Sequence, residues 1–201
     1  MLSLKDVYKQ SYAPEVYTPP EPKTDLHVPP KAYYDTALRL AIMIKESGFE
    51  FDQILCPARG GVPLADFLSR VFKKPVAILV TSSYDDASCK RTKIKISEHI
   101  AMIDNTLGKK VLLVDDMSDS GATFEALLPH LQAKYPDTEF RTAVLWVKNG
   151  SSFIPNHYVQ IVGKHTWIHQ YFEEFSPETL KNAMAKKNAQ AIWAPSAMAK
   201  L

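Results

Sequence analysis

Apolar and polar positions recur along the chain with two different periods. Helical spacing of buried positions at Ala37, Leu40, Ala41 and Ile44 predicts a helix that begins near residue 31 and ends before Gly48. The same spacing predicts helices over residues 64–71 and 124–131. Short, largely apolar runs instead predict buried strands, at residues 53–56, 76–82, 111–114, 140–147 and 158–162.

Strands that alternate with helices in this way are typical of an α/β fold. We therefore predict a mostly parallel, twisted sheet with helices on both faces and a Rossmann-like core. Ligands of such folds bind beyond the carboxyl ends of the strands. The loops after Cys56, Ser82, Val114 and Val147 are accordingly the places to look for a site.

Proline content divides the chain into segments. Six of the 14 prolines lie within the first thirty residues, which predicts an extended N-terminal arm over residues 1–31, with a disordered tail as the alternative. Residues 32–175 carry the alternating pattern and form the predicted domain. Residues 176–201 form a predicted helical tail, which opens with Ser176 as a helix cap and Pro177 at the first helical position. Residues 96–108 support no functional prediction.

The composition excludes several classes of protein. The chain has 201 residues, of which 46% are apolar and 23% charged, and its net charge is +2. Such a domain needs no disulfide or metal staple, and a charge this small excludes a global basic field for nucleic acid. Apolar runs reach only five residues, too short to cross a membrane. With no apolar stretch typical of a signal peptide at the start, we expect a cytoplasmic protein.

The most informative segment follows the strand of residues 111–114. Asp115 and Asp116 come first, and then a turn of small or hydroxylic residues leads into a helix: Ser118, Asp119, Ser120, Gly121, Ala122 and Thr123. Backbone N–H groups at such a helix start favour a phosphate. Two acids would repel a phosphate unless they face another part of the ligand. A ribose 5-phosphate fits, because its vicinal hydroxyls can donate to the carboxylates while the helix start holds the phosphate. A plain helix cap beside solvated acids is the alternative interpretation.

Three further groups follow strands at the same predicted edge. Arg59, Gly60 and Gly61 open a helix, and their alternative interpretation is an ordinary glycine turn with an exposed arginine. Lys90 and Arg91 lie in a basic run, which on its own is typical of a solvated face. Lys148 ends a strand, where a salt-bridged lysine is the alternative to a ligand contact.

His165 and His169 have a spacing compatible with a metal, but with no third ligand nearby in the sequence we expect no zinc site.

Asp115, Asp116, Ser120, Gly121 and Thr123 match the phosphoribosyl pyrophosphate (PRPP) motif, and the segment resembles that of type I phosphoribosyltransferases. Three more loops, residues 57–63, 81–85 and 166–168, resemble the xanthine-guanine branch of the purine enzymes. The resemblance spans roughly residues 33–175. The residues after Ile168 depart from that branch, which leaves the preferred base open.

The resemblance implies a type I phosphoribosyltransferase fold with a small hood region. It also implies Mg²⁺-dependent transfer of the phosphoribosyl group from PRPP to guanine, xanthine or hypoxanthine in purine salvage, which gives a nucleoside monophosphate and pyrophosphate. Other possibilities are a non-catalytic module that senses PRPP or nucleotides, and a transferase for another nitrogenous base. Small-molecule substrates, no membrane or nucleic-acid partner, and a homodimer or homotetramer are expected.

The resemblance also assigns roles to residues. Asp115 and Asp116 would hold ribose hydroxyls and magnesium-bound water, and Asp119 would act as general base or orienting group at purine N7. Residues 118–123 would bind the 5-phosphate. Arg59, Gly60 and Gly61 would bind pyrophosphate, with a non-proline cis peptide at Gly60 and a basic lid cation at either Lys90 or Arg91. Lys148 would donate to a purine O6, Trp167 would stack on the base, and the Ile168 carbonyl would accept from an exocyclic amine.

Overall fold

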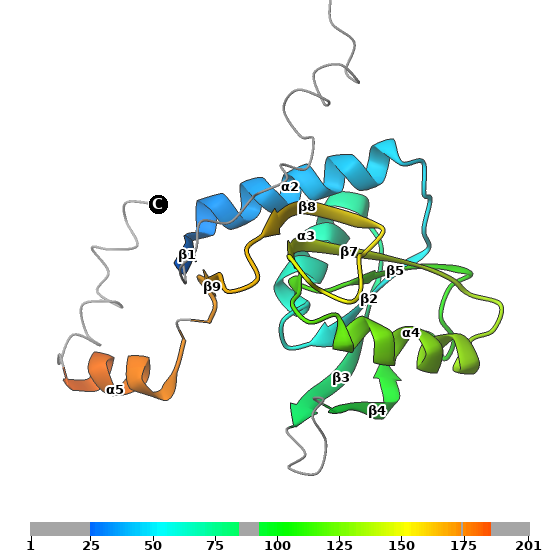
Figure 1. Ribbon diagram of the computed structural model, residues 1–201. Coiled ribbons are helices and arrows are strands. Elements are labelled where there is room, and N and C mark those ends of the chain that lie inside the picture. The colour runs from blue at the N-terminus through cyan, green and yellow to red at the C-terminus, as the bar shows by residue number, and fades with distance from the viewer. Residues whose placement is uncertain (1–24, 85–92, 174, 186–201) are drawn as a thin grey trace, which may run out of the picture.

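Figure 1 shows the computed structural model, which describes residues 25–84, 93–173 and 175–185. Its strands are β1 (Asp25–Val28), β2 (Gln53–Ala58), β3 (Val76–Tyr84), β4 (Lys93–Ala101), β5 (Lys110–Val114), β6 (Met117–Ser118), β7 (Glu139–Lys148), β8 (His157–Val162) and β9 (Trp167–Gln170). Its helices are α2 (Pro30–Glu46), α3 (Val62–Phe72), α4 (Ala122–Lys134) and α5 (Pro177–Ala185). No helix among these residues is both long and apolar enough to cross a membrane.

A seven-stranded sheet forms the centre of the molecule. Its order is β4-β3-β2-β5-β7-β6, with β8 paired to β7. Every pairing in it is parallel except that of β3 with β4, which confirms the predicted mostly parallel sheet. β5 and β6 pair with successive parts of β7, at residues 139–143 and 146–147. The two residues between β5 and β6 therefore lie at the carboxyl end of β5, beside the middle of β7.

Helices cover both faces of this sheet, as predicted. Neighbouring strand residues point to opposite sides: Ile54 joins the core beneath α2 and α3, whereas Leu55 joins the core beneath α4. Leu112 and Leu113 divide in the same way. Both strands are thus buried on both faces, which explains their uninterrupted apolar runs.

The predicted helix near residue 31 is α2, which begins at Pro30. Ala37, Leu40, Ala41 and Ile44 are all buried, so the face read from the sequence is the face that packs. Proline suits the first helical position because its missing N–H has no partner to lose there. The helix ends before Gly48, whose φ of +71° is left-handed.

Four strands of the structure were not predicted. β4 falls largely within the stretch that supported no functional prediction, and β6 is only two residues long. β1 lies inside the segment predicted as an arm and pairs in parallel with β9, which makes a separate two-stranded sheet. This small sheet places the segment after β9 beside the carboxyl ends of the main strands.

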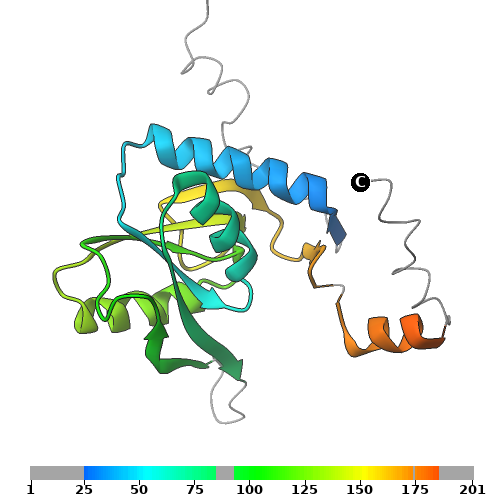
Figure 2. The same cartoon turned by 180° about the vertical axis from the view of Figure 1, so that it is seen from behind.

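α5 confirms the predicted cap. The Thr179 N–H donates to Ser176 Oγ at 3.3 Å, and the helix begins at Pro177. In Figures 1 and 2 α5 (orange) is set apart from the main sheet, beyond the two-stranded sheet.

Candidate active site

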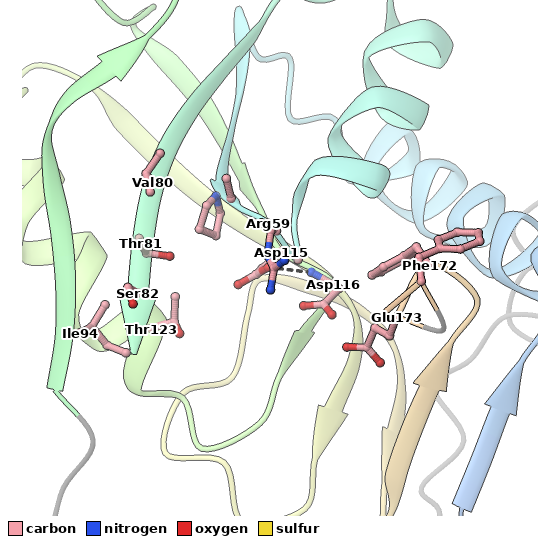
Figure 3. A pocket seen from close by; sticks show the side chains of 14 residues that line it. Arg59, Val80, Thr81, Ser82, Ile94, Asp115, Asp116, Thr123, Phe172 and Glu173 are labelled. Carbon is pink, nitrogen blue, oxygen red and sulfur yellow. Dashed lines mark hydrogen bonds between the residues drawn. The ribbon is translucent and has the colours of Figure 1, made fainter. Parts of the chain in front are cut away.

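A cavity of about 930 Å³ opens at the carboxyl ends of β2, β3 and β5 (Figure 3). This is the edge at which α/β folds bind ligands. Segments that are distant in the sequence line it together: Pro57, Ala58, Arg59, Gly60, Val80, Thr81, Ser82, Ile94, Asp115, Asp116, Thr123, Phe172, Glu173 and Phe175. Several of these belong to the predicted phosphate, pyrophosphate and acid groups, so the structure brings those predictions to one place.

Asp115 and Asp116 lie side by side between β5 and β6, and each is only 9% exposed. The backbone holds them to β7, since the Asp115 N–H donates to the Ala143 carbonyl at 3.1 Å and the Leu145 N–H to the Asp116 carbonyl at 3.0 Å. Their side chains also accept backbone N–H groups, those of Asp116 at 3.0 Å and Met117 at 2.9 Å. The carboxylates are therefore held firmly at the cavity wall.

Burial decides how the acid pair ionises. It raises the pKa of Asp115 well above its ordinary value, and the charge of Asp116 raises it further. Burial also raises the pKa of Asp116, while a hydrogen bond from the Gln170 side chain opposes this rise. A pair in this setting resists carrying two negative charges until cationic or hydroxyl groups of a ligand face it.

The glycine loop of residues 59–61 packs directly against the acid pair. A Cβ on Gly60 would lie 2.9 Å from Asp116 Oδ1 and 3.3 Å from Asp115 Oδ1, and one on Gly61 would lie 2.6 Å from the Val114 carbonyl. Glycine is therefore needed at both positions, because a side chain there would collide with neighbouring atoms of the protein. The cis peptide bond joins Ala58 and Arg59, one residue before the position that the resemblance implied.

The predicted phosphate turn, residues 118–123, is shaped by Gly121, which has a φ of +90° and precedes α4. The Ala122 N–H donates to Ser120 Oγ at 3.3 Å, and the Thr123 side chain faces the cavity (Figure 3). The turn thus presents the start of α4 to the cleft, as an anion site requires.

A loop that the sequence did not single out, residues 151–153, braces this turn. The Ser152 hydroxyl and N–H both donate to the Ser120 carbonyl, at 2.8 and 2.9 Å. Ser118 is 2% exposed, and its hydroxyl lies 3.0 Å from the Phe153 carbonyl and from Ser151 Oγ. The Ser118 hydroxyl therefore supports the turn from behind, which differs from its predicted contact with phosphate.

Two predicted base-binding residues meet each other. Lys148 Nζ lies 2.8 Å from Asp119 Oδ2, with the lysine side chain 9% exposed and the aspartate 59% exposed. The same ammonium lies 5.8 Å from the centre of the Trp167 ring, which is itself exposed. Lys148, Asp119 and Trp167 form one cluster. The Ile168 side chain is buried in the core, and the contact predicted for its backbone carbonyl stays a prediction. Sequence spacing does not link Lys148 to Asp119, because their contact depends on the fold.

Aromatic and amide groups behind the acid pair were missed by the sequence analysis. Gln170 is 1% exposed and donates to Asp116 Oδ2. Tyr33 is fully buried, and its pKa is raised by burial and by the Asp116 charge. The Gln170 N–H also donates to Glu173 Oε2 at 3.3 Å, close to the cavity. Among the predicted pyrophosphate residues, Lys90 and Arg91 lie outside the described part of the chain.

Comparison with known proteins places this geometry in context. Residues 30–175 match the family model described as the phosphoribosyl transferase domain. The structure is similar to xanthine-guanine-hypoxanthine phosphoribosyltransferase of Helicobacter pylori, with a TM-score of 0.66 and 26% identity over 80% of this chain and 99% of that one. It is also similar to purine phosphoribosyltransferase of Pyrococcus horikoshii, with a TM-score of 0.62 and 26% identity over 76% of this chain and 95% of that one.

A curated relative shares a shorter region. Ribose-phosphate pyrophosphokinase 1 of Streptococcus agalactiae is 37% identical over 70 residues, which are 35% of this chain and 20% of that protein. The chain thus spans only a fifth of the length of that relative.

Proposed function

The chain belongs to the phosphoribosyl transferase domain family, as its motifs predicted, and from this premise we propose that it transfers the phosphoribosyl group of PRPP to a purine base. The observation that carries the proposal is the contact between Gly60 and the acid pair, which sets the glycine loop beside two carboxylates in one cavity. PRPP has a pyrophosphate, two ribose hydroxyls and a 5-phosphate, and this cavity offers a group suited to each.

Each part of PRPP has a proposed position. The 5-phosphate binds at the start of α4, where Gly121 and Thr123 shape the turn. The pyrophosphate binds near Arg59 and Gly60, at the start of α3. Asp115 and Asp116 accept hydrogen bonds from the ribose hydroxyls between these two sites.

The acid pair also fits Mg²⁺, because this ion prefers carboxylate oxygens and water and both carboxylates line the cavity. Bound there between protein and substrate, Mg²⁺ would neutralise charge that builds up on the departing pyrophosphate. We propose contact with Asp115 and Asp116 through water, since the ion gives up its hydration shell reluctantly.

In the proposed reaction a purine nitrogen forms a bond to C1′ while the bond from C1′ to the pyrophosphate oxygen breaks. The electron pair of the broken bond leaves with pyrophosphate. Asp119 holds, or takes up, the proton at purine N7, and Lys148 keeps that carboxylate in position through their 2.8 Å ion pair. Lys148 then reaches a purine O6, with Trp167 beside the ring.

The test is direct. The full chain is incubated with Mg²⁺, PRPP and either guanine, xanthine, hypoxanthine or adenine, and nucleotide and pyrophosphate are separated by chromatography. We expect nucleotide from at least one 6-oxopurine. Asp115→Asn should abolish turnover, whereas the control Asp35→Asn, on an exposed ion pair of α2, should not.

Asp119→Asn separates catalysis from binding. We expect a loss of rate of about 10²–10⁴-fold, typical of a general base, with little change in PRPP affinity. Tight PRPP binding by the wild-type chain without turnover of any base would instead support a sensing module, and turnover of a base other than a purine would correct the substrate class. Unfolding curves confirm that each variant is folded.

The assembly and location of the protein belong to the same proposal. We propose a homodimer or homotetramer that acts in the cytoplasm on these small molecules. Light scattering of the full chain measures the mass in solution directly.

A further inference from the structure

The outer face of the small sheet formed by β1 and β9 carries an unusual group of side chains. In the parallel register Asp25 lies opposite Trp167, and His27 lies opposite His169. Alternate residues of both strands point inward, since Val28, Ile168 and Gln170 are buried. Two histidines and a carboxylate therefore share the face that points away from the core.

The three side chains lie close enough to share one ligand. The rings of His27 and His169 stack with centroids 4.3 Å apart and planes 7° from parallel. Asp25 Oδ2 lies 3.6 Å from His169 Nε2. One donor atom from each of Asp25, His27 and His169 lies within 4.8 Å of the other two.

One of these donors is buried without a partner. His169 Nε2 is inaccessible to solvent and has no hydrogen-bond partner among the described residues. Its nearest carboxylate, that of Asp25, is beyond hydrogen-bonding distance at 3.6 Å. Buried polar atoms nearly always have a partner, so this nitrogen calls for one that the chain alone does not supply.

We propose that Asp25, His27 and His169 bind a divalent transition-metal ion, for which Zn²⁺ is the best match. Two imidazoles and one carboxylate are donors that Zn²⁺ accepts at about 2.0–2.2 Å in a tetrahedron, with water in the fourth position. Ligands of such a tetrahedron are roughly 3.4 Å apart. The two stacked rings are nearly parallel, so they cannot both direct a nitrogen at one ion as they stand. Binding therefore requires that the exposed side chains of Asp25 and His27 rotate toward His169 to reach that distance.

The donor set separates this site from the magnesium site of the proposed reaction. Mg²⁺ prefers oxygen ligands and does not favour imidazole. The acid pair Asp115 and Asp116 offers only oxygens, whereas the site on β1 and β9 offers two nitrogens. Asp25 and His27 precede residues 30–175, which match the family, whereas His169 lies within them.

A metal ion here would fasten β1 to β9. A two-stranded sheet is marginally stable by itself, and one ion bound by residues of both strands adds a cross-link that only the paired strands offer. The same strand β9 carries Gln170, which reaches the acid pair from the opposite face of the small sheet.

The experiment is a calorimetric titration of the full chain with Zn²⁺, after chelator treatment and in the presence of excess Mg²⁺. We expect one equivalent to bind. His27→Ala and His169→Ala should each weaken binding by at least about tenfold, and Asp25→Asn should do the same with minimal change in shape. Replacement of Zn²⁺ by Co²⁺ should give the visible absorption of a tetrahedral site in the wild type and not in these three variants.

Two control variants make the result specific. His165→Ala removes an exposed histidine of the same segment that is not part of the cluster, and Asp115→Asn alters the proposed magnesium site. Both variants should bind Zn²⁺ as the wild type does. Absence of Zn²⁺ binding by the wild type, unchanged binding after His27→Ala and Asp25→Asn, or an equal loss in His165→Ala would each overturn the proposal. Because binding is measured without PRPP, the outcome is independent of the transferase activity.

Discussion

Replacing Gly121 with alanine tests whether the loop of residues 151–153 holds the phosphate turn in its shape. Gly121 has a φ of +90°, and an added Cβ would lie 2.5 Å from the Phe153 backbone nitrogen and 2.6 Å from Ser152 Oγ. The left-handed conformation costs a non-glycine residue about 1–2 kcal/mol. The close approach to a backbone atom adds about 1–3 kcal/mol, the usual cost of overpacking. We therefore expect Gly121→Ala to lower the free energy of unfolding by about 2–5 kcal/mol.

Gly150 provides a matched control. Its φ is +91°, nearly the same as that of Gly121, but the nearest atom to an added Cβ is Lys164 Cδ at 3.7 Å, an ordinary contact. Gly150→Ala should therefore cost only the conformational part, about 1–2 kcal/mol. The difference between the two variants measures the contact with residues 151–153 alone.

The assays are urea denaturation and steady-state kinetics with PRPP. If the turn moves to relieve the clash, each 1.4 kcal/mol of lost binding energy raises the KM for PRPP about tenfold. We expect such a rise for Gly121→Ala and an unchanged KM for Gly150→Ala. Equal stabilities of the two variants, together with an unchanged KM in both, would refute the idea that this loop shapes the phosphate site.

Three further changes probe the acid pair and the base side of the cleft. Because the pKa of Asp115 is raised, the folded protein keeps a proton that the unfolded chain releases, and stability is lost as pH rises from the ordinary carboxyl range through the raised pKa. Asp115→Asn carries no such charge, so urea denaturation should show this variant to be more stable than the wild type at neutral pH, and it should be inactive. Gln170→Leu removes a hydrogen bond that lowers the pKa of Asp116, so the acidic limb of the kcat/KM profile should move to higher pH. Lys148→Met breaks the ion pair with Asp119, and the KM for the base should rise about ten- to a hundredfold, as for a lost charged hydrogen bond, with a smaller change in the KM for PRPP.

The sequence predicted those parts of the fold in which local pattern and packing agree. The apolar spacing in α2 identified its buried face because a helix brings residues 37, 40, 41 and 44 to one side, whatever packs there. The strands β2 and β5 were readable because helices cover both of their faces, so nearly every residue is apolar.

Parts of the fold that depend on distant pairing could not be predicted in this way. β1 is a strand because Asp25 and its neighbours pair with residues from Trp167 onward, and nothing local in a proline-rich segment reveals that partner. β4 alternates only weakly between exposed and partly exposed residues, so its pattern predicted no buried face. The support of Ser120 by Ser152 likewise depends on two loops that only the finished fold brings together.

The site itself was predictable to the extent that its chemistry is local. Residues 115–123 form one continuous segment that contains carboxylates, hydroxyls and a glycine, so an anion site beside two acids could be predicted from their order. The roles that the family resemblance assigns to them stay a prediction. The pairing of Lys148 with Asp119 was not predicted, although each residue had been assigned separately to the base. Charge attraction between Lys148 at the end of β7 and Asp119 in the phosphate turn explains the pairing, but only the fold brings these two segments together.

Gly60 shows how the acid pair and the anion loops depend on one another. With its missing side chain, the glycine loop approaches within contact distance of both carboxylates, so the proposed pyrophosphate site lies beside two acids. Two buried carboxylates next to a bound anion repel it unless positive charge lies between them. The raised pKa values of Asp115 and Asp116 reflect the electrostatic cost of placing negative charge here when no ligand is bound. A cation that arrives together with the anion lowers both costs at once, so the proposed PRPP site should bind magnesium-bound PRPP more tightly than a free phosphate.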